Sequence, residues 1–177
     1  MHEPVRHFQF QVRIVVLNYN GEKILGRCLP SIVQAAQNSK YKTTVTVLDN
    51  CSTDGSLSLL AKDFPAIDIY KAPENRVLCS YNEYLKKISE PYVILLNNDI
   101  KVNENFLDPL IESFEKNKNV FMVTSMCLMW EGNCYEGGRS KARMKYGLFW
   151  SASIFPGCEA QCQKPGFTMA AGFGAFD

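Results

Sequence analysis

The stretch YVILLNND, residues 92–99, is a short apolar run that ends in two amides and a carboxylate. Its apolar part is rich in strand formers and too short for a stable helix, which predicts a strand buried on both faces in the middle of a parallel sheet. Asn97, Asn98 and Asp99 would then stand at the carboxyl edge of that sheet, where open α/β sheets bind their ligands. A plain turn with an Asx-type hydrogen bond is the alternative that this stretch leaves open.

The same succession of a strand-like run and a polar end recurs along the chain. Strand-like runs are predicted at residues 12–17, 43–48, 67–70 and 92–96, with a further extended segment at 120–129. Amphipathic helical stripes follow the first four runs, at residues 24–36, 57–64, 77–88 and 106–114. This alternation predicts an α/β fold with a mainly parallel, twisted sheet flanked by helices.

Three polar strand ends are expected to lie side by side, because parallel strands carry their carboxyl ends at one edge. This set suits a nucleotide diphosphate held together with a divalent metal. Asp99 would ligate Mg²⁺ or Mn²⁺, and phosphate and water oxygens would complete the shell. Asp49 would accept a hydrogen bond from a base N–H, Tyr19 would offer a flat face to a pyrimidine, and the backbone near Leu17 would bond the ligand.

Length and composition narrow the class of protein. A chain of 177 residues, 46% hydrophobic and 21% charged, is expected to form a single domain. The formal net charge of +1 gives no argument for a nucleic acid partner, and none is expected. A cytoplasmic location is expected, because we find no signal peptide core and no run of about 18 apolar residues. Histidine occurs only at His2 and His7, which argues against Ser-His-Asp and Cys-His nucleophilic catalysis.

The region after Trp130 combines a basic stripe with an aromatic patch. Basic residues alternate with smaller or apolar ones at positions 139, 141, 143 and 145, so a strand would place their charges on one face. Residues 146–155, which follow, are rich in aromatic side chains. Peripheral contact with a membrane at its inner face, or with a lipid-phosphate acceptor, is one interpretation. A solvated strand face beside ordinary core is the other.

Four short motifs at the predicted strand ends carry a resemblance to a known family. They are LNYNG at residues 17–21, LDNCSTDGS at 48–56, ENR at 74–76 and LLNND at 95–99. In this order they resemble the family 2 glycosyltransferases of the GT-A fold, and among these the rhamnosyltransferase-like members. The resemblance implies one GT-A domain over residues 1–177, with residues 12–128 as the nucleotide-sugar-binding part and residues 129–177 as the start of the acceptor-side part.

The resemblance also implies roles for individual residues. In that family, the residues matching Tyr19 and Asp49 contact the nucleotide base, and those matching Asn97, Asn98 and Asp99 form the DxD motif. Asp99 is then the ligand of Mn²⁺ or Mg²⁺, and the two asparagines contact the ribose or the phosphates. Because the first acid of the motif is Asn97 here, as in rhamnosyltransferase-like members, the resemblance supports a dTDP-sugar donor as well as a UDP-sugar donor.

The reaction implied is an inverting, metal-dependent transfer of a sugar to a glycan or lipid-linked acceptor, as in polysaccharide and cell-surface glycan synthesis. Two departures from the family pattern bear on it. Residues 77–81 are bulky where the family has small glycines before an asparagine, here Asn82, so the donor pocket is expected to differ. The general base is expected after Asp177, so we expect a C-terminally truncated fragment that is inactive by itself.

Two other functions remain open at this point. A non-catalytic nucleotide-sugar-binding module is compatible with the missing base and with the unusual residues 77–81. A sugar-phosphate nucleotidylyltransferase has a similar fold. That class needs a glycine-rich, basic phosphate loop after the first strand, and residues 18–24 do not form one.

Overall fold

The computed structural model describes residues 10–116, 122–125, 127–130, 135–137, 141–146 and 148–152. Contacts between residues divide the chain into two compact units, Met1–Ile111 and Glu112–Asp177. The first unit, described next, contains the three predicted polar strand ends.

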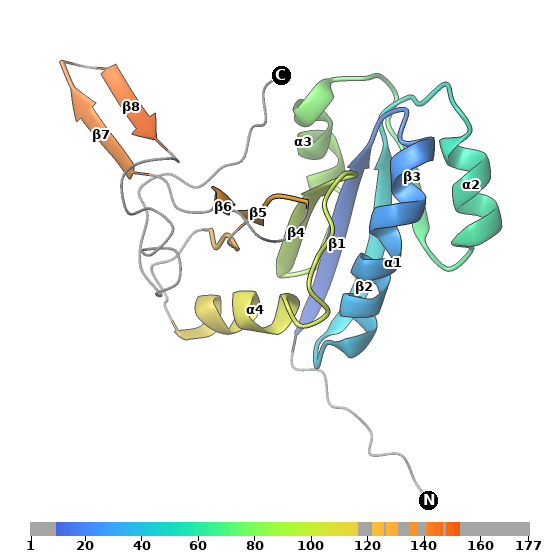
Figure 1. Cartoon of the computed structure of the whole chain (residues 1–177), viewed down its shortest axis with the longest axis horizontal. Helices are drawn as coiled ribbons and strands as arrows, with labels where there is room; N and C mark the ends of the chain where they lie inside the picture. The colour runs from blue at the N-terminus through green and yellow to red at the C-terminus, as the bar shows by residue number, and fades with distance from the viewer. Residues whose placement is uncertain are drawn as a thin grey trace, which may run out of the picture. The chain divides into compact units, whose positions relative to one another are not determined.

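A four-stranded parallel sheet forms the centre of the first unit. Its strands are β1 (Gln11–Asn18), β2 (Lys42–Asp49), β3 (Asp68–Lys71) and β4 (Tyr92–Asn97). They lie in the order β3-β2-β1-β4, and every neighbouring pair is parallel (Figure 1). The predicted α/β fold with a parallel sheet is therefore confirmed in this unit.

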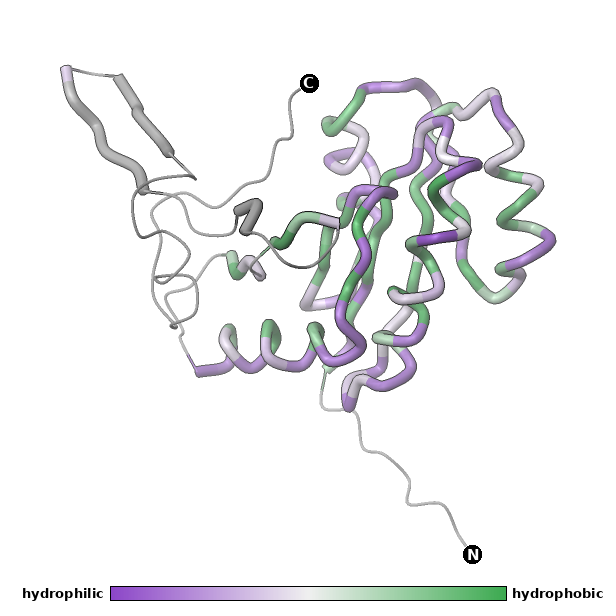
Figure 2. The backbone as a smooth tube through the Cα atoms, in the orientation of Figure 1, coloured by the Kyte–Doolittle hydropathy of each residue, from purple (hydrophilic) through white to green (hydrophobic). Residues whose placement is uncertain are grey.

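Helices cover both faces of this sheet. They are α1 (Glu22–Asn38), α2 (Ser56–Asp63), the 3₁₀ turn η1 (Val77–Cys79) with α3 (Ser80–Leu85), and α4 (Leu107–Lys116). One buried cluster packs Leu29 of α1, Leu60 of α2 and Ile111 of α4 against the strands. A smaller cluster on the other face contains Tyr81 and Tyr84 of α3. Figure 2 shows the amphipathic pattern most clearly along α4, which is hydrophobic on one side of its coil and hydrophilic on the other.

β1 is the central strand of the core and marks the point where the strand order reverses. Val12, Ile14 and Val16 are fully buried in one cluster, and Val15 is fully buried in the other, as alternating side chains require. The chain adds β2 and β3 on one side of β1 and then β4 on the other. Open α/β sheets bind ligands beyond the strand ends at such a reversal, so this topology predicts a binding site beyond the carboxyl ends of β1 and β4.

The prediction that β4 lies in the middle of the sheet is wrong for the part of the chain that the structure describes. There β4 pairs with β1 alone and forms the sheet edge, and Leu95 is 45% exposed. The apolar run has another cause, because Ile94 and Leu96 pack against one cluster and Val93 packs against the other. Such a run indicates cover on both faces of a strand, not the number of its neighbours in the sheet.

The predicted helix over residues 77–88 is shorter than expected and begins differently. Val77–Cys79 form a 3₁₀ turn, and the α-helix runs only from Ser80 to Leu85. Val77 has a φ of 53° and is 70% exposed, so it does not lie on the buried face predicted for it. A β-branched residue in the left-handed region is strained, because its Cβ crowds the neighbouring carbonyl oxygen.

Replacing Val77 with glycine is expected to stabilise the protein by about 0.5 to 1 kcal/mol. Glycine adopts a positive φ without the steric cost, and the side chain removed is mostly exposed, so little buried apolar surface is lost. Urea denaturation would give the free energy of unfolding. Val77→Ala is the matched control, because it trims the side chain but keeps the Cβ that causes the strain. A Val77→Gly variant less stable than the wild type would contradict the strain.

Arg13 ties β1 to β2 and to the segment before β4. Its guanidinium donates to Glu90 (2.8 Å from Nε to Oε1), to Thr46 Oγ1 (2.7 Å) and to the Tyr84 hydroxyl (3.3 Å). The hydrogen bond with Glu90 raises the pKa of Arg13, and the same bond lowers the pKa of the Glu90 carboxyl. Both groups are mostly buried, so this ion pair fixes the sheet against the segment that leads into β4.

In the second unit, the described residues form two short antiparallel pairs. β5 (Cys127–Leu128) pairs with β6 (Tyr135–Gly137), and β7 (Lys141–Lys145) pairs with β8 (Leu148–Ala152). Within the extended segment predicted at 120–129, only β5 is a strand among the residues described. The basic stripe falls partly on β7, but the structure describes only the backbone of that strand. Membrane contact therefore stays a prediction. No helix in the described ranges is long and apolar enough to cross a bilayer.

Candidate functional site

The predicted site residues come from three strand ends that lie side by side. Leu17 is in register with Leu48 of β2 and with Asn97 of β4, so β1, β2 and β4 end at the same level. Asp49 is the last residue of β2, and the pair that completes the LLNND motif follows directly after β4. Tyr19 follows β1 and is 51% exposed. The expected convergence of polar strand ends is therefore present, with an exposed aromatic ring beside it.

Asp49 is the most enclosed of the predicted ligand-binding residues, with an exposed fraction of 2%. Its Oδ1 accepts a hydrogen bond from Asn18 Nδ2 (3.1 Å), and its Oδ2 accepts one from the backbone N–H of Ser52 (3.1 Å). A carboxylate has about four acceptor positions, so capacity for a further donor remains. The structure thus fixes the orientation of this carboxylate, while its contact with a base stays a prediction.

Asn18 is absent from the predicted set, yet it lies fully buried at the end of β1. Its Nδ2 donates to Asp49 Oδ1 and to Ser52 Oγ (3.0 Å), and its Oδ1 accepts from Asn98 Nδ2 (2.9 Å). Every polar atom of the side chain therefore has a partner inside the protein. The sequence did contain a signal, because an amide that directly follows a buried strand must find such partners.

Asn50 connects the segment after β2 to the segment after β3. Its Nδ2 donates to Asn75 Oδ1 (2.7 Å) and to the carbonyl of Val77 (3.3 Å), and its Oδ1 accepts from the Ser80 hydroxyl (2.6 Å). The strained conformation of Val77 is thus held by a buried asparagine. Sequence reasoning missed this role, because the partners lie far away along the chain and no spacing pattern links them.

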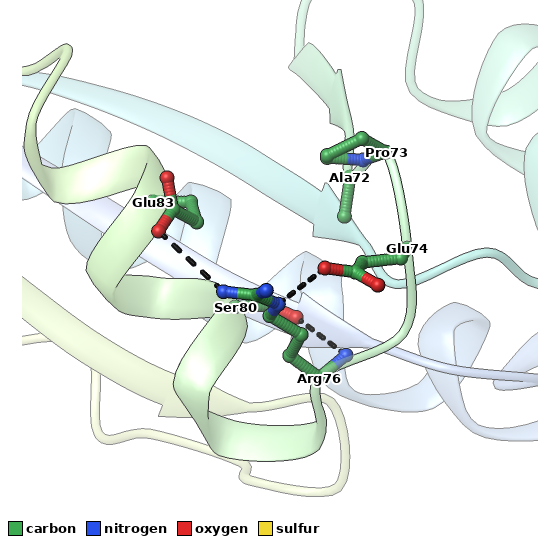
Figure 3. A pocket seen from close by; sticks show the side chains of 6 residues that line it. All are labelled: Ala72, Pro73, Glu74, Arg76, Ser80 and Glu83. Carbon is green, nitrogen blue, oxygen red and sulfur yellow. Dashed lines mark hydrogen bonds and ion pairs between the residues drawn. The ribbon is translucent and has the colours of Figure 1, made fainter.

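A pocket of about 250 Å³ opens beside these segments. Its lining residues are Ala72, Pro73, Glu74, Arg76, Ser80 and Glu83 (Figure 3). Arg76 lies between Glu74 and Glu83 and forms an ion pair with each, the second at 3.8 Å. The backbone N–H of Ala72 donates to the carbonyl of Asp49 (2.8 Å), so the pocket borders the end of β2. Arg76 is a charged donor at this edge that the predicted set did not include.

Tyr81 of α3 contacts the carboxyl end of β4. Its hydroxyl donates to the carbonyl of Leu96 (2.7 Å). Burial raises the pKa of the phenol far above its usual value, against a smaller opposite effect from the backbone of Leu17, so the hydroxyl is neutral. This bulky residue of the 77–81 segment therefore packs against the strand ends, where a small residue would leave space.

Asp99 and its neighbours provide the donors for the predicted metal. Asp99 and Asn97 are exposed, and Asn98 is half-buried. The pKa of the Cys28 thiol in α1 is raised by burial and then by the charge of Asp99, so the field of this carboxylate reaches α1. No group of three or more His, Cys, Asp and Glu side chains forms a metal cluster among the described residues. One carboxylate with amide oxygens fits a hard ion that takes its other ligands from phosphates and water.

The chain resembles known proteins both in sequence and in fold. A family model described as Glycosyl transferase family 2 matches residues 13–171. The structure of S. aureus TarS 1–349 has a TM-score of 0.56 and 18% identity, and the match covers 76% of this chain and 42% of that one. No curated protein matches the chain.

Two similar solved structures contain ligands. The complex of S. aureus TarS 1–349 with UDP has a TM-score of 0.51 and 21% identity, covering 67% of this chain and 34% of that one. The mannosyltransferase PcManGT from Pyrobaculum calidifontis, in complex with GDP-Man and Mn²⁺, has a TM-score of 0.52 and 21% identity, covering 71% and 38%. Such identities show a shared fold alone, and this chain spans less than half the length of each structure.

Proposed function

Because the chain belongs to glycosyl transferase family 2, we propose that it binds a nucleotide-diphosphate sugar at the ends of β1, β2 and β4 and transfers the sugar to a hydroxyl acceptor. The family and the α/β fold of its GT-A neighbours agree with the resemblance in the sequence motifs. One observation carries the proposal. Asp49, Tyr19 and Asp99 lie at the carboxyl ends of β2, β1 and β4. The strand order reverses at β1, and a sheet of this topology binds ligands there.

The donor that we propose is a UDP-sugar or a dTDP-sugar. Asp49 accepts from the base N–H, the exposed ring of Tyr19 stacks on the pyrimidine, and the backbone near Leu17 completes the contacts. Asn97 and Asn98 contact the ribose or phosphates. The UDP complex of a similar fold supports a nucleotide donor. Another similar structure contains GDP-Man, so the binding of GDP has to be compared with that of the pyrimidine nucleotides.

We further propose that Asp99 holds Mn²⁺ or Mg²⁺ together with the donor phosphates. Its exposure supports a site in which substrate phosphates and water complete the coordination of the ion. The Mn²⁺ in the complex of the mannosyltransferase supports the same choice of ion. When bound, the ion would neutralise negative charge that develops on the departing diphosphate.

The proposed transfer is an inverting displacement on a glycan or lipid-linked acceptor, in polysaccharide or cell-surface glycan synthesis at the inner face of the membrane. The acceptor oxygen bonds to the anomeric carbon as the bond to the nucleotide diphosphate breaks, and a general base takes the hydroxyl proton. The carboxylates at the strand ends serve the donor in this scheme. The base is therefore assigned to none of them.

Calorimetric titration with UDP, dTDP and GDP, each with Mn²⁺ and with chelator, tests the proposal. We expect one pyrimidine nucleotide to bind more tightly than GDP, and to do so only with metal. Asp49→Ala should weaken that binding by roughly 1 to 3 kcal/mol, the cost of a lost partner at a buried polar group. Asp63→Ala, which removes an exposed carboxylate at the end of α2, is the matched control. Failure of all three nucleotides to bind would refute a donor site in this chain.

A further inference from the structure

A chain of side-chain hydrogen bonds crosses the ends of β4, β1 and β2. Asn98 Nδ2 donates to Asn18 Oδ1 (2.9 Å), and Asn18 Nδ2 donates to Asp49 Oδ1 (3.1 Å). The backbone N–H of Ser52 then holds the other carboxylate oxygen, Oδ2, at 3.1 Å. We name the side chains of Asn98, Asn18 and Asp49 the amide relay. It joins the residue proposed to read the base to the residue beside the proposed metal ligand.

Asn18 cannot act by touching a ligand. Its side chain is fully buried, and both of its polar atoms are used within the protein. The two ends of the relay differ in this respect, because Asn98 is half-buried and Asp49 retains acceptor capacity. Any influence of Asn18 on a ligand must therefore pass through the positions of Asp49 and Asn98.

Gly21 provides the space in which the relay forms. A Cβ on this buried glycine would overlap both Asn18 Oδ1 and Asn98 Nδ2, the two atoms of one hydrogen bond. Neither atom is backbone or the far end of a long flexible side chain, so a substitution would displace the bond. The absence of a side chain at Gly21 is thus a second feature that serves the same contact.

We propose that Asn18 is a positioning residue that couples base recognition at Asp49 to diphosphate and metal binding at residues 97–99. The relay sets the two groups relative to each other, so that the base and the diphosphate of one nucleotide are bound as a unit. This inference rests on the proposed function for its ligand. Its structural part, the mutual positioning of Asp49 and Asn98, is independent of any ligand.

A double-mutant cycle tests the coupling. The affinity for UDP with Mn²⁺ is measured for Asp49→Ala, Asn98→Ala and the double variant. Each single change breaks the same relay. The fold-loss of affinity in the double variant should therefore be smaller than the product of the two single fold-losses, by about twofold or more. The same cycle in an Asn18→Ala background should be additive. A role of Asn18 in stability alone would lower the melting temperature and leave the cycle unchanged.

Gly21→Ala is a second test of the relay, to be used if Asn18→Ala does not fold. It keeps every polar side chain. It should abolish the non-additivity as Asn18→Ala does. Asn38→Ala is the matched control, because Asn38 is an exposed asparagine near the opposite end of α1. In its background the non-additivity should persist. Additive losses in the wild-type background would overturn the coupling, while UDP binding itself would leave the proposed function standing.

Hydrogen exchange at the Ser52 amide gives a readout without ligand. This N–H donates to Asp49. Asn98→Ala should free Asn18 and thereby Asp49, so the Ser52 N–H should exchange faster. Asn38→Ala should leave the exchange rate unchanged. An unchanged Ser52 rate in Asn98→Ala would overturn the positioning. If the wild type binds no nucleotide, the proposed function fails, and the Ser52 rate alone decides whether Asn18 positions Asp49.

Discussion

Asp99→Ala is expected to remove the metal-dependent part of nucleotide binding and to leave the fold intact. Asp99 is exposed after β4, and the hydrogen bonds among the described residues do not include one to its side chain, so its loss should not change the melting temperature. Without this carboxylate, the proposed ion loses the charged ligand that follows β4. The affinity for UDP or dTDP measured with Mn²⁺ should therefore fall to the value measured with chelator.

Two further variants separate charge from shape in this experiment. Asp99→Asn keeps the shape of the side chain but removes its negative charge, and it should lose the metal effect as alanine does. Asp63→Ala removes an exposed carboxylate at the end of α2 and should retain the full metal effect. Undiminished Mn²⁺-dependent affinity in Asp99→Ala would show that the metal binds elsewhere.

Arg13→Ala should destabilise the protein strongly, by about 3 kcal/mol. The change leaves the Glu90 carboxylate without its cation although its side chain is only 10% exposed, and it removes the bonds to Thr46 and Tyr84. Chemical denaturation at neutral pH would give the loss in free energy of unfolding. Lys86→Ala breaks an exposed ion pair with Glu83 and should change stability little.

The cost of Arg13→Ala should also depend on pH. The hydrogen bond from Arg13 holds the pKa of Glu90 below its usual value, so ionised Glu90 contributes stability above its unfolded pKa. That contribution is lost as the pH falls through the lower, folded pKa. The difference in unfolding free energy between wild type and variant should therefore be full near neutral pH and shrink below about pH 4. A difference that stays constant down to pH 3 would contradict this account.

The strands and the polar ends of the site could be predicted from the sequence because their signals are local. The apolar runs that became β1, β2, β3 and β4 match the structure closely, since a run of strand formers followed by a polar turn needs only neighbouring residues to be recognised. Parallel pairing then follows from the alternation of strands with helices, and it brings Tyr19, Asp49 and Asp99 to one edge.

The errors arose where the outcome depended on distant residues. The position of β4 in the described sheet depends on which strands pair with it, and its apolar run reports only the cover on its two faces. Val77 was expected on a helix face, but Asn50 holds its carbonyl, and the segment forms a 3₁₀ turn with a positive φ. No local pattern contains the partner that decides such a conformation.

The sequence by itself determined the family, the parallel sheet and the strand ends that carry the proposed donor site. Only the tertiary structure decided how these polar ends are connected. Asn18 joins residues that lie 31 and 80 positions away along the chain, and its burial makes each of those hydrogen bonds obligatory. Propensity and spacing act over a few residues, whereas a buried amide is satisfied by whatever the folded sheet brings beside it.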